Sequence, residues 1–453
     1  MMLSFKNLPL RPDALSHQIF NILKSDDKGA FSLLMEMILL ETGNKIAREN
    51  WQAAQLVNLF NHAGIRSLFW RERFKGKKPS AIKLGKLPIL TRNDLRKQVQ
   101  TEGSLIRAID NLPYSQHATS GSTGTPVQFF FTRTNGIYNE IRSFAQYVLD
   151  DRDVSWNRLR LNQFFYAQDK NLIYEEADRH GGVLANLFNT GRNANLYYNV
   201  FDRDEFIKKA GAFRGDFWVL GAPVSHSLPT QLTAQECYDL GARLWMVIGT
   251  TVSPALRHDL NHAGIDVVSN YSCEEVGLIG SECVHKPGYF HVASSNVIVE
   301  QSGHVVHDGV DCGHLLVTHL HSYATPFIRY DIGDIGTVHE ECPCGFKGQT
   351  IGNLFGRITA TLRNEDGTRS GIMIRATELD KIVPLKEFRV RQTGFKTLVF
   401  EVVTDDRSAQ SASQLRGYIL GLIGRDFEVD VRFCETIDWG QTAKRHGFRC
   451  EID

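Results

Sequence analysis

Apolar residues near the start of the chain recur at the spacing of an amphipathic helix. Two sets show the pattern, one of Leu15, Ile19 and Ile22 after Asp13, the other of Leu56, Leu59, Phe60 and Ala63. Side chains three and four positions apart share one face of a helix, so each set predicts a helix that packs through that face. We therefore expect packing helices over residues 13–75. A later set, Ile137, Ile141, Phe144 and Val148, predicts one more.

Between residues 215 and 270 the pattern changes, and short continuous apolar runs alternate with helix-like segments. The apolar runs are residues 217–220, 244–248 and 266–268, and the helix-like segments are 229–240 and 254–263. Buried strands separated by helices are typical of parallel α/β layers. Residues 289–340 instead show short alternating runs rich in Val, His and Gly, which predict a mainly β region.

These patterns predict an α/β fold with two domains. A large N-terminal domain of αβ layers covers residues 1–356, with a helical region at 1–90 and a β-rich part at 289–350. A small α+β domain covers 357–453, with a strand at 396–403 and a helix at 414–423. The length of 453 residues fits this division, because single cores stop growing beyond about 250–300 residues.

Composition excludes several classes of protein. The 51 basic residues equal the 51 acidic ones, so no charge excess indicates a nucleic-acid partner. No run of about 18 apolar residues exists, which argues against a membrane partner, and the N-terminal segment lacks a signal-peptide core. Eight cysteines in a chain of this size do not make a disulfide scaffold. We expect a cytoplasmic protein whose thiols are reduced or bound to metal.

The segment Ser120–Pro126, with the sequence SGSTGTP, is the strongest functional signal in the chain. Glycines let a backbone fold closely around a ligand, and hydroxyls with backbone N–H groups suit phosphate oxygens. A Walker-type loop is a poor match because no lysine follows Gly124. A flexible surface loop is the alternative. The segment predicts an ATP-using enzyme, with phosphate contacts from Ser120, Gly121, Ser122, Thr123, Gly124 and Thr125.

Further motifs follow in a fixed order. They are Asn270-Tyr271-Ser272-Cys273-Glu274-Glu275, Ile328-Arg329-Tyr330-Asp331-Ile332-Gly333-Asp334, Gly356-Arg357 and Lys444. Together with the glycine-rich segment and residues 87–91, they resemble the adenylate-forming (ANL) enzymes, and more narrowly the branch of phenylacetate–CoA ligase and coenzyme F390 synthetase. The resemblance implies that ATP activates a small carboxylic acid as an acyl-adenylate, which is then passed to an acceptor.

The resemblance also implies roles for individual residues. Glu275 matches the magnesium-associated glutamate, a hard oxygen ligand, and Arg329 is placed with it among the catalytic residues. Asp334 matches the aspartate that accepts hydrogen bonds from the ribose hydroxyls. Read singly, Glu275 also suits a surface carboxylate, Asp334 a turn residue after Gly333, and Arg357 a solvated loop charge. The other nucleotide-binding positions that the resemblance implies are Gly249, Thr250, Asn270, Tyr271 and Arg357.

Lys444 matches the late lysine that bridges the substrate carboxylate and the α-phosphate in this family. A compact ammonium suits a transition state in which charge builds on oxygens of both partners. Ala443 precedes it here, where relatives usually have glycine. Lys347 and Lys396 are the alternative candidates for this role. Lys444 could also be a solvated lysine near the C-terminus without a catalytic role.

Cys283, His291, Cys342 and Cys344 form a second set of candidate ligands. Thiolate and imidazole donors in a set of four suit tetrahedral, structural zinc. His285 competes with His291 because it lies two residues from Cys283. Some relatives carry a cysteine, a Gly-x-His and a late Cys-x-Cys at these places, which favours His291. Reduced cysteines without metal are the alternative.

Two departures from the family pattern leave the acyl acceptor open. In this family an acidic hinge residue, about which the mobile C-terminal domain turns between half-reactions, follows Gly356-Arg357, but residues 358–360 contain no acidic residue. The glycine-rich segment that helps to admit CoA matches the family pattern only weakly at 369–373. We favour CoA, with a carrier-protein thiol or an amine as alternatives. An aryl or arylacetic acid is the expected substrate, with the aromatic run 164–166 as a candidate wall. A non-catalytic nucleotide-binding relative and a homodimer also stay open.

Overall fold

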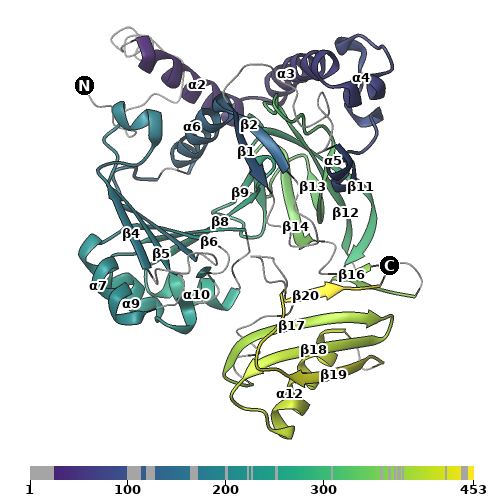
Figure 1. The fold of residues 1–453 in the computed structure, drawn as a ribbon. Helices are drawn as coiled ribbons and strands as arrows, with labels where there is room; N and C mark the ends of the chain where they lie inside the picture. The colour runs from purple at the N-terminus through teal and green to yellow at the C-terminus, as the bar shows by residue number, and fades with distance from the viewer. Residues whose placement is uncertain are drawn as a thin grey trace.

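The computed structural model contains a large N-terminal assembly of helices and sheet and a smaller C-terminal sheet packed on one face by α12 (Ala409–Ile423) (Figure 1). Among the described helices, none is both long enough and apolar enough to cross a bilayer. The structure describes residues 25–98, 114–118, 128–150, 152–163, 172–198, 202–221, 224–225, 228–249, 252, 254–307, 310–357, 361–365, 369–371, 374, 379, 382–423, 426–439 and 447–452.

The main sheet of the described chain has twelve strands in the order β11-β12-β13-β14-β10-β9-β8-β7-β6-β3-β5-β4. Its parallel strands are β3 (Arg158–Gln163), β5 (Asn193–Tyr198), β6 (Phe217–Gly221), β7 (Leu244–Ile248) and β8 (Asp266–Cys273). The antiparallel strands are β4 (Leu172–Ala177), β9 (Gly277–Glu282), β10 (Phe290–Val292), β11 (Val297–His307), β12 (Val310–His319), β13 (Tyr330–His339) and β14 (Thr350–Arg357). The α/β class, with its β-rich part, is therefore confirmed.

Helices cover both faces of the parallel strands, which explains their continuous apolar runs. In β6, Phe217 and Val219 pack into the core that includes residues of α2 (Ser25–Thr42) and α6 (Arg133–Leu149). Trp218 and Leu220 pack into the opposite core. That core is covered by α7 (Arg203–Phe213), α9 (Ala234–Asp239) and α10 (Pro254–His262), as Figure 1 shows.

The predicted N-terminal helices are present from Ser25 onward. After α2 come α3 (Lys45–Arg66) and α4 (Leu68–Phe74), and Leu59, Phe60 and Ala63 of α3 are buried against the β-rich part. The earlier set at 15–22 lies outside the described residues. Short connections follow at η2 (Pro79–Ala81), η3 (Leu84–Lys86) and α5 (Arg92–Gln98).

One predicted helix, over 229–240, is shorter than expected. A 3₁₀ turn, η5 (Leu228–Thr230), comes first, and α9 begins only at Ala234. The reason is a capping box: the Thr233 side chain accepts from the backbone of Glu236, and the Glu236 side chain accepts from the backbone of Thr233. A capping residue has non-helical backbone angles, so it separates the two segments.

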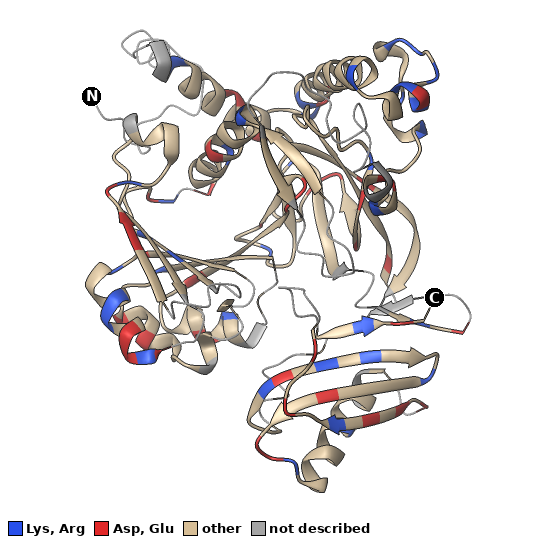
Figure 2. Ribbon diagram, viewed as in Figure 1, with Lys and Arg blue, Asp and Glu red and all other residues tan. Residues whose placement is uncertain are grey.

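The C-terminal part has a core of its own. Its sheet has the order β19-β18-β17-β20, and α12 packs on one face through Leu415 and Ile419. Acidic and basic residues lie on neighbouring strands of this sheet (Figure 2), and Arg389 and Arg391 both donate to Glu401. The strands are β17 (Leu385–Gly394), β18 (Thr397–Thr404), β19 (Glu428–Phe433) and β20 (Phe448–Cys450), with a separate hairpin of β15 (Thr361–Arg363) and β16 (Arg369–Gly371). The domain boundary after residue 356 stays a prediction.

A buried ion pair joins α2, α6 and the β-rich part. Arg142 of α6 is 1% exposed, and its Nη1 lies 3.5 Å from Oε1 of Glu41 in α2. The Ser295 backbone and hydroxyl both donate to the same oxygen at 3.0 Å. Burial lowers the pKa of Arg142, and the Glu41 charge opposes that shift. The carboxylate is thus the charge partner of an arginine that has almost no access to water.

We predict that Glu41→Ala strongly destabilises the fold. Removing one partner of a buried pair leaves an uncompensated charge and costs about 3–5 kcal/mol. The measurement is urea unfolding followed by circular dichroism. Glu340→Ala is the matched control, because Glu340 pairs with Lys45 at the exposed surface and its loss should barely move the midpoint. Equal shifts in the two variants would contradict the prediction.

Candidate functional site

The carboxyl ends of β7 and β8 bring two predicted nucleotide-binding residues to one edge of the sheet. Gly249 follows β7 directly, and Asn270 lies in β8 opposite Ile248, the last residue of β7. Gly249 has φ +83°, a left-handed conformation that suits glycine. Ligands of α/β sheets bind at this end of parallel strands, so the edge is a suitable nucleotide site.

Tyr271 and Asp334 connect that edge to the β-rich part. The Tyr271 hydroxyl donates to Asp334 Oδ2 at 2.7 Å. Asp334 lies in β13, and its backbone is paired with that of Arg357 in β14. The structure therefore brings together Tyr271, Asp334 and the backbone of Arg357, three of the predicted nucleotide-binding residues.

Glu275 lies in the turn between β8 and β9 and is only 6% exposed. The Tyr330 hydroxyl donates to its Oε1 at 2.9 Å, and Arg92 Nη2 lies 3.6 Å from the same oxygen. Burial and the Glu275 charge raise the pKa of Tyr330 well above its ordinary value, so this hydroxyl stays a donor. The predicted magnesium ligand is thus a buried carboxylate held by a phenol and a guanidinium.

Arg329, which was predicted to be catalytic, links residues 87–90, the segment before α5, to the start of β13. Its Nε donates to Glu300 at 3.0 Å, and its Nη1 donates to the Leu87 carbonyl. Leu90 continues the attachment, since it donates to the Arg329 carbonyl and accepts from the Asp331 N–H. Within the described residues, the Arg329 side chain therefore contacts Leu87 and Glu300 and not Glu275.

Sequence reasoning missed Arg92 and the role of Tyr330 as partners of Glu275. Arg92 directly follows residues 87–91, which carried part of the family resemblance, and Tyr330 lies inside a recognised motif. No spacing rule joins them to Glu275, because the three residues meet only through the pairing of Leu90 with β13.

The glycine-rich segment, Ser120–Thr125, lies outside the described residues, but the strands on either side are placed. β1 (Tyr114–Ala118) and β2 (Gln128–Thr132) form a hairpin that pairs up to Ala118 and Gln128. Phe129 of β2 is buried in the same core as Val276 and Tyr330, the neighbours of Glu275. The strand that follows the predicted phosphate-binding segment is thus packed into the same core as the Glu275 turn.

Thr250, Lys444 and the aromatic run 164–166 also lie outside the described residues. On either side of the lysine segment the chain is fixed to β17, where Arg389 Nη1 donates to the Asp438 carbonyl at 2.7 Å and Val390 N donates to the Gly447 carbonyl at 2.9 Å. The two alternative lysines take part in exposed ion pairs, Lys347 with Glu341 and Lys396 with Asp426.

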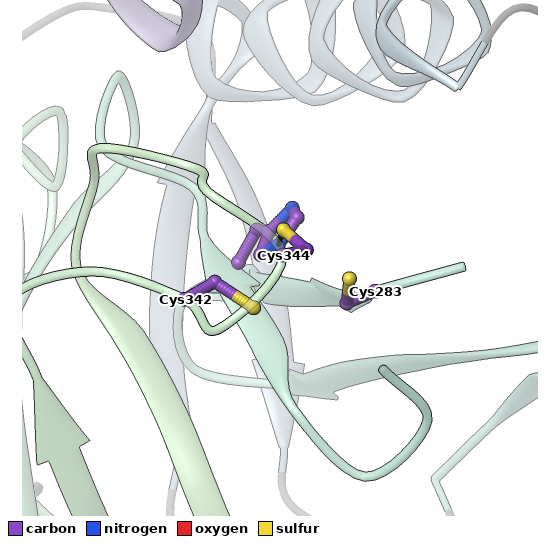
Figure 3. Close-up of side chains that lie close together, drawn as sticks. Cys283, Cys342 and Cys344 are labelled. Atoms are coloured by element: carbon purple, nitrogen blue, oxygen red, sulfur yellow. Dashed lines mark hydrogen bonds between the residues drawn. The ribbon is translucent and has the colours of Figure 1, made fainter. Parts of the chain in front are cut away.

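Cys283, His291, Cys342 and Cys344 come together in space. One ligand atom from each lies within 4.8 Å of all the others. Cys283 follows β9, His291 lies in β10, and the other two belong to the turn between β13 and β14, as Figure 3 shows for the three cysteines. Gly345, with φ +99°, donates to the Cys342 carbonyl at 2.9 Å and so closes this turn.

The cluster favours His291 over His285 as the fourth donor. His291 Nε2 lies 3.4 Å from Cys344 Sγ, whereas His285 is exposed and outside the group. Burial, and then the nearby His285, lower the pKa of His291 to about 4, which keeps the ring neutral. Burial raises the pKa of Cys342 to about 12. At Cys344 burial is outweighed by hydrogen bonds from the Phe346 backbone and the two other thiols, which lower its pKa.

Glu282 ties the turn that carries Cys283 to the nucleotide edge of the sheet. Its two oxygens accept from Arg257 Nη2 at 2.8 and 2.7 Å. The backbone of Ser269, next to Asn270, donates to Oε2 at 2.9 Å, and Gly288 N donates to Oε1 at 2.9 Å. A cavity of about 1070 Å³ opens on the other side of the cluster, toward α2 and α6, and does not include Glu275 or Asp334.

Solved structures of similar fold allow a comparison with this geometry. A 2-hydroxyisobutyryl-CoA ligase in the postadenylation state with 2-HIB-AMP is 15% identical, with a TM-score of 0.63 over 92% of this chain and 91% of that one. The same ligase with 2-HIB-AMP and CoA in the thioesterification state gives a TM-score of 0.56 at 15% identity over 91% of each chain. This chain has the fold of an acyl-CoA ligase.

That likeness confirms the expected fold of a large N-terminal domain with a smaller C-terminal one. The narrower phenylacetate–CoA ligase branch stays a prediction. The sequence matches no family model and no curated protein.

Two buried histidines lie near β2, His319 at the end of β12 and His321 in the turn that follows it. His319 is 1% exposed, and its Nδ1 has no hydrogen-bond partner within the described ranges. His321 Nε2 lies 3.0 Å from the Ser295 carbonyl, and its ring packs on Tyr138 with centroids 4.1 Å apart. Burial lowers the pKa of His319 to about 3 and that of His321 to about 4.

These histidines predict a loss of stability in mild acid. An unfolded histidine titrates near about 6.5, so below that pH the unfolded state binds protons that the native state does not. Their stabilising effect is complete above the unfolded pKa and is lost as the pH falls toward about 4, at up to about 1.4 kcal/mol per pH unit for each ring. Urea midpoints measured between about pH 7 and 5, where most carboxylates stay ionised, provide the test.

A variant pair isolates the histidine contribution. His321→Gln should flatten the dependence of the midpoint on pH, whereas His285→Gln, at an exposed position, should leave the slope unchanged. An unchanged slope in His321→Gln would show that the buried ring does not titrate on unfolding.

Proposed function

We propose that this chain is an AMP-forming acid–thiol ligase, which activates a small carboxylic acid with ATP and passes the acyl group to CoA. The observation that carries the proposal is a double link between β13 and the end of β8: Tyr271 donates to Asp334, and Tyr330 donates to Glu275. β2, which follows the glycine-rich segment, packs into the same core. Solved acyl-CoA ligases of the same fold bind an acyl-adenylate and CoA, which supports it.

The proposed first half-reaction needs little covalent chemistry from the protein. A carboxylate oxygen forms a bond to the α-phosphorus of ATP as the bond to the bridging oxygen breaks, and pyrophosphate leaves. Ser120–Thr125 would hold the β- and γ-phosphates, and Lys444 would bridge the acid and the α-phosphate. Asp334, oriented by Tyr271, would accept from the ribose hydroxyls.

Glu275 is the residue that would hold Mg²⁺, and its carboxylate is the hard oxygen donor that this ion prefers. The ion would neutralise charge on the phosphate oxygens. In the second half-reaction, a thiol sulfur bonds to the acyl carbon, AMP leaves, and the thiol proton is released. CoA is the acceptor that we propose, with a carrier-protein thiol or an amine as the alternatives.

The test is carboxylate-dependent ATP–pyrophosphate exchange over a panel of aryl, arylacetic, short aliphatic and 2-hydroxy acids. Lys444→Ala should lower exchange about 10²–10³-fold, because a transition-state cation is lost. Lys396→Ala is the control, since Lys396 pairs with exposed Asp426, and it should keep the full rate.

Three outcomes separate the candidate functions. Exchange with a member of the panel, followed by acyl-CoA in the mass spectrum when CoA is added, supports the ligase. Exchange without acyl-CoA moves the acceptor to a carrier thiol or an amine. ATP binding without exchange by any acid would support a non-catalytic nucleotide-binding protein instead.

We also propose that the cluster of Cys283, His291, Cys342 and Cys344 binds one structural zinc ion. Three sulfurs and one imidazole nitrogen lie within 4.8 Å of one another, and a closed tetrahedral set needs ligands about 4 Å apart, so a movement of about 1 Å would bring all four to zinc. The ion would pin the turn after β9 to the turn between β13 and β14.

Metal analysis tests this second proposal. Inductively coupled plasma mass spectrometry should find one zinc per native chain, and Cys342→Ser with Cys344→Ser should remove it and lower the melting temperature, because a structural site contributes folding energy. Cys434→Ser, at a cysteine outside the cluster, should change neither quantity. A native chain without bound metal would overturn the assignment.

A further inference from the structure

Arg92 supplies a positive charge to the Glu275 carboxylate that the sequence motifs did not identify. Its Nη2 lies 3.6 Å from Glu275 Oε1, and the two side chains are 22% and 8% exposed. A carboxylate this far from water is costly unless it is paired and hydrogen-bonded. Arg92 is the described side chain that forms an ion pair with it.

Several bonds fix the backbone that carries Arg92. Leu90 N donates to the Arg329 carbonyl at 3.0 Å, and Asp331 N donates to the Leu90 carbonyl at 2.9 Å. The next residue, Thr91, caps α5: its backbone donates to Asp94 Oδ2 at 2.8 Å, and its hydroxyl accepts from the Asp94 backbone at 3.2 Å. The guanidinium therefore extends from the first turn of a helix anchored on the strand that carries Tyr330.

Both partners of the carboxylate contact the same oxygen. The Tyr330 hydroxyl donates to Oε1 at 2.9 Å, and the Arg92 contact is also to Oε1. The closest contacts that the described residues Tyr330 and Arg92 make with this carboxylate are therefore both to Oε1 and not to Oε2. The two contacts thus orient the group and leave its second oxygen for another ligand.

We propose that Arg92 is a positioning residue, which acts with Tyr330 to hold Glu275 by Oε1 so that Oε2 remains to bind the magnesium ion of magnesium–ATP. The inference rests on the proposed function, because it assigns a partner to the metal-binding carboxylate of that site. Holding the guanidinium at Oε1 places the fixed cation away from the ion, which limits the repulsion between two positive charges. Residues that orient a metal ligand in this way change affinity about 10–100-fold when they are replaced.

The test is a titration with Mn²⁺, which prefers the same oxygen ligands, in the presence of a non-hydrolysable ATP analogue. Free Mn²⁺ is measured by electron paramagnetic resonance, so the readout does not depend on turnover. Arg92→Gln should weaken nucleotide-dependent Mn²⁺ binding about 10-fold or more. Arg92→Lys should restore part of it, because lysine returns the charge without the planar fork of donors.

Arg73→Gln is the matched control. Arg73 Nη2 lies 3.3 Å from Asp94 Oδ1, so its loss loosens the same helix, α5, without removing a contact to Glu275. It should bind Mn²⁺ as the native chain does. All variants are first compared with the native chain by thermal unfolding, so that the titration is made on folded protein.

The outcomes separate this inference from the proposed function. If the native chain binds no Mn²⁺ with the nucleotide analogue, the proposed function fails. If the native chain binds and Arg92→Gln binds equally well, the role of Arg92 is overturned while the proposed function stands. Equal weakening in Arg92→Gln and Arg73→Gln would assign the effect to the position of α5 and would also overturn the inference.

Discussion

The buried carboxylate of Glu275 is the point on which the arrangement of the site depends. A charge with 6% exposure has to be paired inside the protein, and the groups that pair with it come from distant parts of the chain. Tyr330 arrives on β13 and Arg92 on α5, while Glu275 itself lies between β8 and β9. The pairing of Leu90 with β13 is what makes this meeting possible.

The same turn connects to the nucleotide edge on one side and to the Cys/His cluster on the other. β9 runs from the Glu275 turn to Glu282, whose carboxylate binds the backbone next to Asn270. Cys283 follows directly. A short antiparallel strand thus connects the Glu275 turn to the cluster.

The sequence was a good guide wherever the signal was local. The apolar run 244–248 became β7 with the expected bounds, and the helical spacing of Leu59, Phe60 and Ala63 identified a buried face of α3. The predicted helix over 229–240 was longer than the observed α9, because the capping box at Thr233 was not recognised in the sequence.

The sequence motifs identified candidate site residues, but they did not identify the side chains that contact those residues. Tyr271 and Asp334, from two of the motifs, share a hydrogen bond, and four candidate ligands far apart in sequence meet in one cluster. The contact between Arg92 and Glu275 joins residues without any periodic relation, so only the folded chain reveals it. The roles of the glycine-rich segment and of Lys444 stay predictions.

The buried pair of Glu41 and Arg142 has a practical consequence for how the protein can be divided. The Glu41 carboxylate of α2 accepts hydrogen bonds from the backbone and hydroxyl of Ser295. The first described helix is therefore an integral part of the core. A shortened fragment that starts after Glu41 would leave a guanidinium stranded inside the molecule. Any minimal version made for crystallisation or engineering therefore has to retain α2.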